Sequence, residues 1–215
     1  MDIKLLQRIL DLIITPDMRE VVNNPKEGRG ENRTAEEKDL LDSFSPNQFK
    51  SKQKLVDMIH NYVDINSDTE IVIFGGWYGS ILIPMFKDVK KITLIDLDEE
   101  VINIARNRLF NHYKNVEFRI QDVFEFNKLN QYKTANLFIN TSCEHMAPMK
   151  EWPLWEWILR RNNPYFAFTS NNMFGIEGHT NCVNNIEEFK KQLPDTSKVL
   201  SENEVTDERG SRYLL

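Results

Sequence analysis

EIVIFGGWYGSILIPMFKDVKKITLIDLDEE, residues 70–100, is the stretch that decides the fold. The apolar run 71–74 ends in two glycines, a pattern typical of a buried strand that enters a tight turn. SILIPMF, residues 80–86, then predicts a helix, and KKITLID, residues 90–96, predicts a second strand. A strand, a helix and a strand in such close succession predict a parallel βαβ unit with a right-handed crossover.

Two polar features of this unit predict a ligand site. The turn from Gly75 to Gly79 lets the backbone bend sharply and offers free N–H groups at the start of the next helix. Asp96 ends the second strand about 20 residues later, and its carboxylate, which has only acceptors, suits the two hydroxyls of a ribose. Asp98 is predicted to cap the following helix. The alternatives are a tight turn without a ligand and a solvated Asp96.

Strands and helices continue to alternate along the rest of the chain. The pattern predicts a helix at 98–110, strands at 116–121 and 134–140, a helix at 149–161, a strand at 165–170, a helix at 186–193, and a hairpin of 197–205 with 209–215. The predicted fold is therefore α/β: a doubly wound, Rossmann-like, mostly parallel sheet with a C-terminal antiparallel hairpin. Ligands of such sheets bind at the carboxyl ends of the strands.

The N-terminal part has a different texture. Residues 1–20 carry apolar positions at helical spacing, and the charged segment 23–39 predicts a mobile loop. Thr34 is a predicted helix N-cap, and a further helix is expected over 46–63. We expect 1–65 to form a helical lid or extension and 66–215 to form the sheet domain.

Composition limits the compartment and the partners. The chain has 215 residues, a formal net charge of −6 and a pI near 5.4. No apolar run approaches the ~20 residues of a membrane span, and no signal peptide is recognisable, so we expect a cytoplasmic protein. The acidic balance favours a small molecule or a protein over nucleic acid as partner. Neither the composition nor the motifs indicate an oligomeric state.

Residues 71–108 resemble the class I S-adenosylmethionine-dependent methyltransferases, and the later order of elements fits them as well. IVIFGGWYGS and ITLIDLDEEVINIAR are also similar to the glycine turn and acid of aminopropyltransferases such as spermidine synthase. The resemblance implies S-adenosylmethionine as cofactor. It would be bound by the glycine turn and by the residues that follow the next strands: Gly75, Gly76, Trp77, Tyr78, Gly79, Asp96, Leu97, Asp122, Val123 and Asn140. In the methyltransferases the acid that matches Asp122 often accepts a hydrogen bond from the adenine amino group, and the backbone of the next residue contacts the ring.

The fourth strand is followed by an unusually polar run, NTSCEHM, residues 140–146. In the methyltransferases this strand end faces the transferred group. Glu144 or His145 is the predicted general base, and Asn140 is predicted to orient the nucleophile. The alternative is a polar loop that binds its own backbone. The run is neither the (D/N)PPY motif of nucleic-acid and glutamine methyltransferases nor the aspartate-centred turn of aminopropyltransferases.

Other chemistry at these positions is less favoured. Cys143 lies near His145, but a nucleophile–base pair needs a third group, and none is visible. Glu144, His145, His179 and Cys182 have the residue types of a metal site, but without helical i, i+4 histidines or close pairs we expect no metal. The amide-rich loop 170–182 brings Asn171, Asn172 and His179 as candidate contacts to the acceptor, or it is a plain surface crossover.

The sequence thus predicts a methyltransferase that uses S-adenosylmethionine and acts on a polar acceptor, most simply a small molecule. Aminopropyl transfer from the decarboxylated cofactor is one alternative. A non-catalytic nucleoside-binding module is another. A nucleic-acid modifier would need Lys50, Lys52, Lys54, Arg160 and Arg161 in one patch, and neighbouring acids dilute it.

Overall fold

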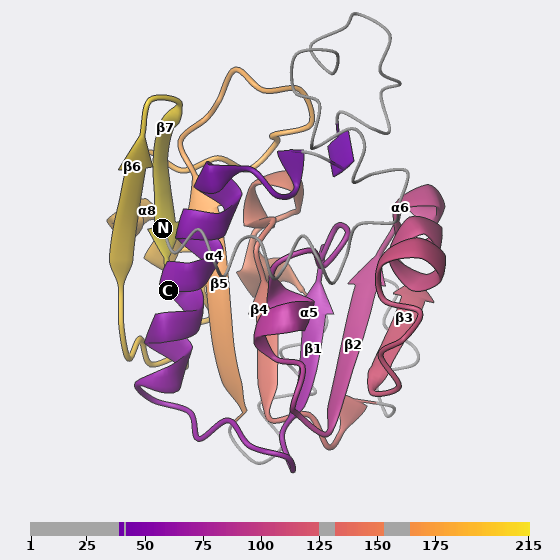
Figure 1. Cartoon of the computed structure of the whole chain (residues 1–215). Helices are drawn as coiled ribbons and strands as arrows, with labels where there is room; N and C mark the ends of the chain where they lie inside the picture. Colours follow the sequence, from indigo (N-terminus) through magenta and orange to yellow (C-terminus); the bar gives the residue numbers. More distant parts are fainter. Residues whose placement is uncertain (1–38, 41, 125–131, 153–163) are drawn as a thin grey trace, which may run out of the picture.

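The computed structural model describes residues 39–40, 42–124, 132–152 and 164–215. Its centre is a seven-stranded sheet with strand order β3-β2-β1-β4-β5-β7-β6 (Figure 1). The strands are β1 (Glu70–Phe74), β2 (Lys91–Asp96), β3 (Val116–Ile120), β4 (Leu137–Asn140), β5 (Tyr165–Asn171), β6 (Asn203–Asp207) and β7 (Gly210–Leu214). Strands β1 to β5 pair in parallel, and β7 pairs antiparallel with β5 and β6. The predicted doubly wound α/β sheet with a terminal antiparallel hairpin is confirmed.

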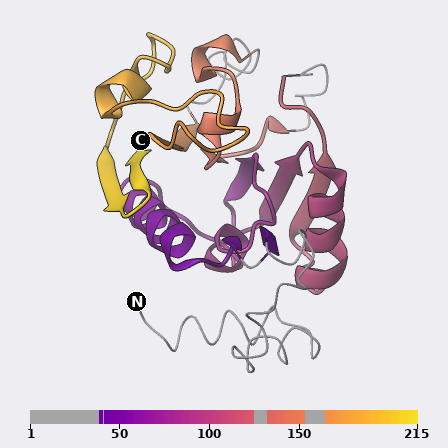
Figure 2. The ribbon, with the colours of Figure 1, turned by 90° about the horizontal axis from the view of Figure 1, so that it is seen from above.

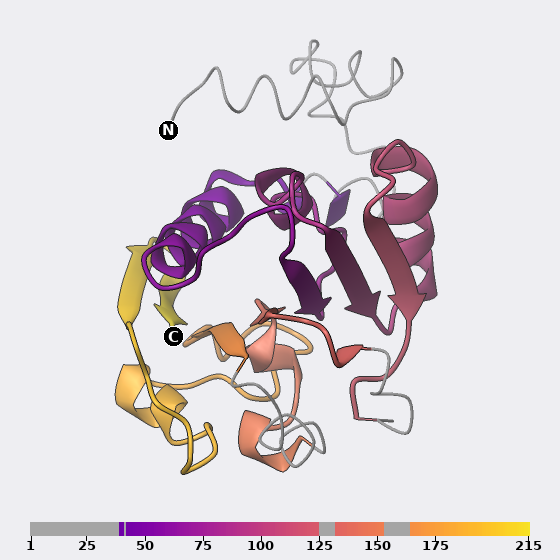
Figure 3. The same ribbon diagram turned by 90° about the horizontal axis from the view of Figure 1, so that it is seen from below.

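Helices cover both faces of this sheet (Figures 2 and 3). Helices α4 (Pro46–His60), α5 (Leu82–Met85) and α6 (Glu99–Ile104) lie on one face, and η3 (Cys143–His145), η4 (Met149–Glu151) and α8 (Ile186–Lys190) lie on the other. Alternate residues of β1 pack into the hydrophobic clusters on the two faces of the sheet. Ile71 and Ile73 belong to one cluster, and Val72 and Phe74 belong to the other. A strand buried on both faces reads as the continuous apolar run seen in the sequence.

The register brings the carboxyl ends of the central strands to one edge. Phe74 at the end of β1 pairs with Ile95 of β2 and with Asn140 of β4. The residues that follow these strands therefore meet at the upper edge in Figure 1, where the loop after β5 arches over them. The polar segments that the sequence places after each strand lie together for this reason.

Helix α6 begins as predicted and ends differently. The Asp98 side chain caps it by accepting hydrogen bonds from the N–H groups of Glu100 and Val101. The single helix expected over 98–110 changes after Ile104 into a π-helical segment, η1 (Ala105–Leu109). Such a segment is a local widening of the helix, which periodicity does not report.

Several predicted bounds need correction. The fourth strand starts at Leu137 rather than at 134, and the terminal hairpin starts at Asn203 rather than at 197. Of the helix expected over 149–161, residues 149–151 form a short 3-10 turn and Trp152 is extended. The remainder of that helix, with Trp155 and Trp157, lies outside the described residues, as do the expected N-terminal helix, the predicted loop up to residue 38 and the Thr34 cap.

Helix α4 packs as part of the sheet's own core. Ser45 caps it, and its apolar face buries Phe49, Leu55 and Ile59 in the same cluster as Ile71 and Ile73 of β1. The division at residue 65 stays a prediction, and α4 belongs structurally with the sheet. Among the described helices, none is long and apolar enough to cross a membrane.

Candidate functional site

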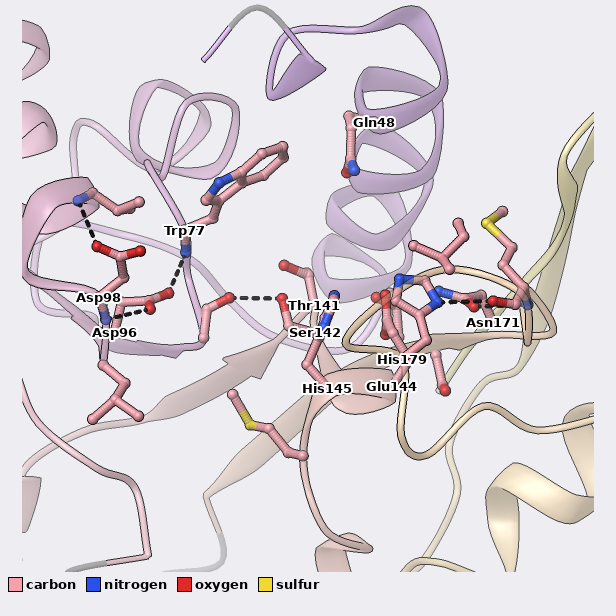
Figure 4. Close-up of a pocket in the computed structure, with 18 of the residues that line it drawn as sticks. Gln48, Trp77, Asp96, Asp98, Thr141, Ser142, Glu144, His145, Asn171 and His179 are labelled. Carbon is pink, nitrogen blue, oxygen red and sulfur yellow. Dashed lines mark hydrogen bonds between the residues drawn. The ribbon is translucent and has the colours of Figure 1, made fainter. Parts of the chain in front are cut away.

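A cavity of about 790 Å³ lies at the carboxyl edge of the sheet (Figure 4). One end of it is lined by residues that follow β1, β2 and β3: Gly75, Trp77, Asp96, Leu97, Asp98, Gln121, Asp122, Val123 and Phe124. The other end is lined by residues of α4, of the β4 and β5 ends and of β7: Gln48, Lys52, Thr141, Glu144, His145, Thr169, Ser170, Asn171, Met173, His179 and Arg212. We call these parts, after the ligands predicted from the sequence, the nucleoside end and the acceptor end.

The glycine turn after β1 is tightly determined. Gly75 has φ +51°, and a Cβ at this position would overlap the Met146 methyl group. Trp77 also has a positive φ of 51°, which is rare for a bulky residue and is held by its N–H bond to Asp96 and its indole bond to Asp39. Backbone strain of this kind gathers at ligand sites, so the turn's shape is consistent with a functional role.

Asp96 connects the turn to the second strand. Its Oδ2 accepts from the Trp77 N–H at 2.8 Å, and its Oδ1 accepts from the Asp98 N–H at 3.1 Å (Figure 4). A carboxylate has about four acceptor positions, so about two stay available after these bonds. The side chain lines the cavity, and the indole of Trp77 does not fill the space beside it. The geometry therefore permits Asp96 to receive two hydroxyls.

The residues predicted to contact adenine line the same cavity. Asp122 lines the cavity and uses Oδ1 to accept the Phe124 N–H at 2.8 Å, which leaves its other oxygen for a ligand. Val123 and Leu97 line the same end, and Leu97 is 68% exposed there. An exposed leucine beside a buried valine offers an apolar surface for a flat ring.

Five predicted site residues are not among those that line the cavity: Gly76, Tyr78, Gly79, Asn140 and the candidate acceptor contact Asn172. Gly76 and Gly79 let the turn pack against Leu94 and Ile83, and the Tyr78 hydroxyl donates to Asp39. Asn140 is fully buried; its Oδ1 accepts from Ser142 N–H and its Nδ2 donates to the Met146 sulfur. These contacts favour a role in shaping the site over direct contact with a ligand.

Glu144 is the buried acid of the acceptor end. It is 9% exposed, and its Oε2 has no hydrogen-bond partner. Burial raises the pKa of Glu144 to about 7, against the lowering effects of its own backbone and of the charges of Lys52 and Arg212. Burial also disfavours the charged form of Lys52 and lowers its pKa to about 8, although the charge of Glu144 acts to raise it.

Two histidines flank Glu144. The His145 and His179 rings lie 4.6 Å apart, centre to centre, and are nearly perpendicular. Burial and the neighbouring His145 lower the pKa of His179. Burial raises the pKa of the Cys143 thiol well above its usual range, so this cysteine is held protonated, and the covalent alternative loses its nucleophile.

Helix α4 and strand β7 bring residues that sequence reasoning missed. Gln48 and Lys52 lie one helical turn apart on α4, and the Lys52 ammonium donates to the Gln48 amide oxygen at 2.5 Å. Arg212 of β7 is ion-paired with Asp207 at 2.6 Å. Polar residues on a helix predict a solvent face, and only the packing of α4 shows that this face turns to the cavity.

Three solved structures with a similar fold are methyltransferases. The magnesium protoporphyrin IX methyltransferase of Synechocystis PCC 6803, with bound S-adenosylhomocysteine, superposes with TM-score 0.61 at 11% identity over 90% of this chain and 91% of its own. A SAM-dependent methyltransferase of Aquifex aeolicus gives 0.52 at 16% identity over 79% and 91%, and the N-methyltransferase NodS of Bradyrhizobium japonicum gives 0.50 at 13% over 79% and 95%. The fold is that of the S-adenosylmethionine-dependent methyltransferases.

The sequence matches the model of a second protein family. The spermine/spermidine synthase domain family matches residues 53–156, which hold the glycine turn, Asp96, Asp122 and Glu144. The comparison with curated proteins gives no match. The chain is thus similar both to class I methyltransferases, in fold, and to aminopropyltransferases, over about half its length.

Proposed function

We propose that this protein transfers a methyl group from S-adenosylmethionine to a small polar acceptor. The observation that carries the proposal is the continuous cavity that joins Gly75, Asp96 and Asp122 at one end to Glu144 and His145 at the other. Its volume of about 790 Å³ falls within the roughly 300–1,000 Å³ range of small-molecule sites. One cavity with a nucleoside end and a separate polar end suits a two-substrate transfer.

In this mechanism the protein acts mainly by alignment. Asp96 would hold the ribose hydroxyls, and Asp122 the adenine amino group, so that the sulfonium methyl points toward Glu144. An acceptor held beside Glu144 and His145 would meet the methyl carbon in line. Holding two reactants in attack geometry removes most of the entropic cost of their encounter.

Aminopropyl transfer is the second candidate, and the match to the spermine/spermidine synthase domain favours it. It would use the same nucleoside end and a different arm of the cofactor. Methyl transfer is preferred because the run after β4 is NTSCEHM rather than the aspartate-centred turn of the aminopropyltransferases.

Calorimetric titration separates these functions. S-adenosylmethionine, its decarboxylated form and S-adenosylhomocysteine are titrated in turn into the full-length protein. We expect S-adenosylmethionine and S-adenosylhomocysteine to bind with micromolar dissociation constants, and the decarboxylated form to bind more weakly. Tighter binding of the decarboxylated form would favour aminopropyl transfer, and no binding of any of the three would overturn both proposals.

A further inference from the structure

Glu144, His145 and His179 come together at the acceptor end (Figure 4). One ligand atom of each, a carboxylate oxygen or a ring nitrogen, lies within 4.8 Å of the others. We infer that these three side chains form a binding site for one divalent transition-metal ion of the zinc or manganese type. The sequence favoured no metal, because it has neither helical i, i+4 histidines nor close ligand pairs. His179 lies 34 positions from His145 in the sequence, and the loop after β5 brings the two together.

The hydrogen bonds of the two histidines prepare them as ligands. His145 Nδ1 lies 3.1 Å from the Gly178 carbonyl oxygen, and His179 Nδ1 lies 3.1 Å from the Met173 carbonyl oxygen. A carbonyl only accepts, so in both rings Nδ1 carries a proton, and Nε2 is the ring nitrogen available to bind a metal ion. Metal-binding histidines are typically oriented by such a bond from the second ring nitrogen to a backbone carbonyl.

The carboxylate supplies a second, independent indication. Glu144 is 9% exposed, and its Oε2 is buried without a hydrogen-bond partner. Buried polar atoms without partners are rare, and each calls for a ligand, a water or an ion. Two imidazoles beside an unpartnered carboxylate oxygen form a donor set that a divalent cation completes.

The site has the form of an open metal centre. Two imidazoles and one carboxylate are the protein ligands of several catalytic zinc sites, where a further position stays free for water or substrate. Donors ~2.1 Å from a tetrahedral ion lie roughly 3.4 Å apart, and the donor atoms of these three side chains lie within 4.8 Å of one another. His145 is exposed and all three residues line the cavity, which gives the ion an entry path and an open face toward an acceptor.

The ion would select an acceptor with an oxygen nucleophile, a role that rests on the proposed function. An acceptor hydroxyl bound to the ion releases its proton to water in the cavity. An oxygen lone pair then forms the bond to the methyl carbon while the carbon–sulfur bond breaks. The sulfur leaves with that electron pair as the neutral thioether of S-adenosylhomocysteine, so charge and atoms balance.

Metal binding is tested directly, without an acceptor. Full-length protein without an affinity tag is stripped with a chelator and titrated with Zn²⁺ by calorimetry and with Mn²⁺ by electron paramagnetic resonance. We expect one ion per chain, bound with a micromolar or lower dissociation constant. His145→Ala, His179→Ala and Glu144→Gln should each weaken binding by at least roughly 10-fold.

His112→Ala is the matched control, because His112 is exposed and outside the cavity. It should bind the ion like the unaltered protein, and thermal melting of every variant verifies folding. No stoichiometric binding of either ion, or equal affinities in the His112, His145 and His179 variants, would overturn the site. S-adenosylhomocysteine is titrated into the stripped protein in parallel. If it binds but no ion does, the metal site is wrong and the proposed function stands. If an ion binds but S-adenosylhomocysteine does not, the proposed function is wrong and the metal site stands.

Discussion

At the scale of single residues, Asp96 has two structural bonds and a proposed ligand at once. It holds Trp77 and Asp98 by their backbone N–H groups, and it lines the nucleoside end with its two remaining acceptor positions. Asp98 also lines the cavity, but its Oδ1 accepts the two backbone hydrogen bonds that cap helix α6. These two acids, two positions apart, allow the binding role to be separated from the capping role.

We therefore expect Asp96→Ala to weaken S-adenosylhomocysteine binding by roughly 10- to 100-fold, because a hydrogen bond to a charged acceptor contributes about 1.5–3 kcal/mol. Asp98→Ala should leave the affinity nearly unchanged and lower stability by about 1 kcal/mol through the lost cap. Calorimetry and thermal melting of both variants measure the two effects. Equal affinities for the two variants would show that Asp96 does not hold the ribose.

At the scale of elements, the turn between β1 and α5 is fixed by its packing on the sheet. A Cβ on Gly76 would overlap Leu94 Cδ1 and lie 3.0 Å from Ile73 Cγ2, and both neighbours are fully buried. Gly76 has no side chain because the turn lies directly on the sheet. Its place is structural, although its sequence neighbours line the cavity.

Gly76→Ala should thus destabilise the fold by about 1–3 kcal/mol, the cost typical of overpacking. For a chain of this size that lowers Tm by roughly 3–10 °C. Gly175→Ala is the control, since a Cβ at Gly175 would meet no atom within 4 Å. Thermal melting checks both variants, and an unchanged Tm for Gly76→Ala would mean that the turn is looser than described.

At the scale of the whole molecule, the two edges of the sheet have different tasks. The carboxyl edge holds the cavity, and the opposite edge ties segments together through Glu70. The Glu70 carboxylate pairs with Lys90 Nζ at 2.7 Å and accepts from Thr134 Oγ1 at 2.5 Å. Burial alone would raise the pKa of Glu70, but the hydrogen bonds from Lys90 and Thr134 outweigh it, and the pKa is lowered.

This lowered pKa predicts how stability depends on pH. An acid whose pKa is lower in the folded state stabilises the fold above its unfolded value of 4.5, and that contribution is lost as the pH falls through the folded value. Glu70→Gln should melt about 1–3 °C below the unaltered protein at pH 7, and the gap should begin to shrink as the pH falls below about 4.5 and disappear once the pH is below the lowered folded value. Melting curves from pH 7 to pH 3 test this, with the exposed Glu208→Gln as control. A gap that stays constant down to pH 3 would contradict the assignment.

Local sequence was sufficient for the sheet and for half of the site. The run 71–74 is apolar throughout because both faces of β1 are buried, and Asp98 caps α6 because a short acceptor before a helix bonds its first N–H groups. The placement of Gly75, Trp77, Asp96 and Asp122 beside one cavity was predictable because each lies at or shortly after the end of a strand, and parallel strands end at one edge. Strand bounds and the π-helical turn at η1 were not, since they depend on pairing and crowding with other elements.

The sequence by itself thus determined the α/β architecture and the placement of Gly75, Asp96 and Asp122 at one edge of the sheet, because both depend on patterns within a few residues of each other. Only the tertiary structure decided the acceptor end. Packing of α4 turns Lys52 into the cavity, and the loop after β5 carries His179 to Glu144 and His145. Contacts between residues far apart in the chain are set by how faces pack, and one-dimensional spacing holds no record of that packing.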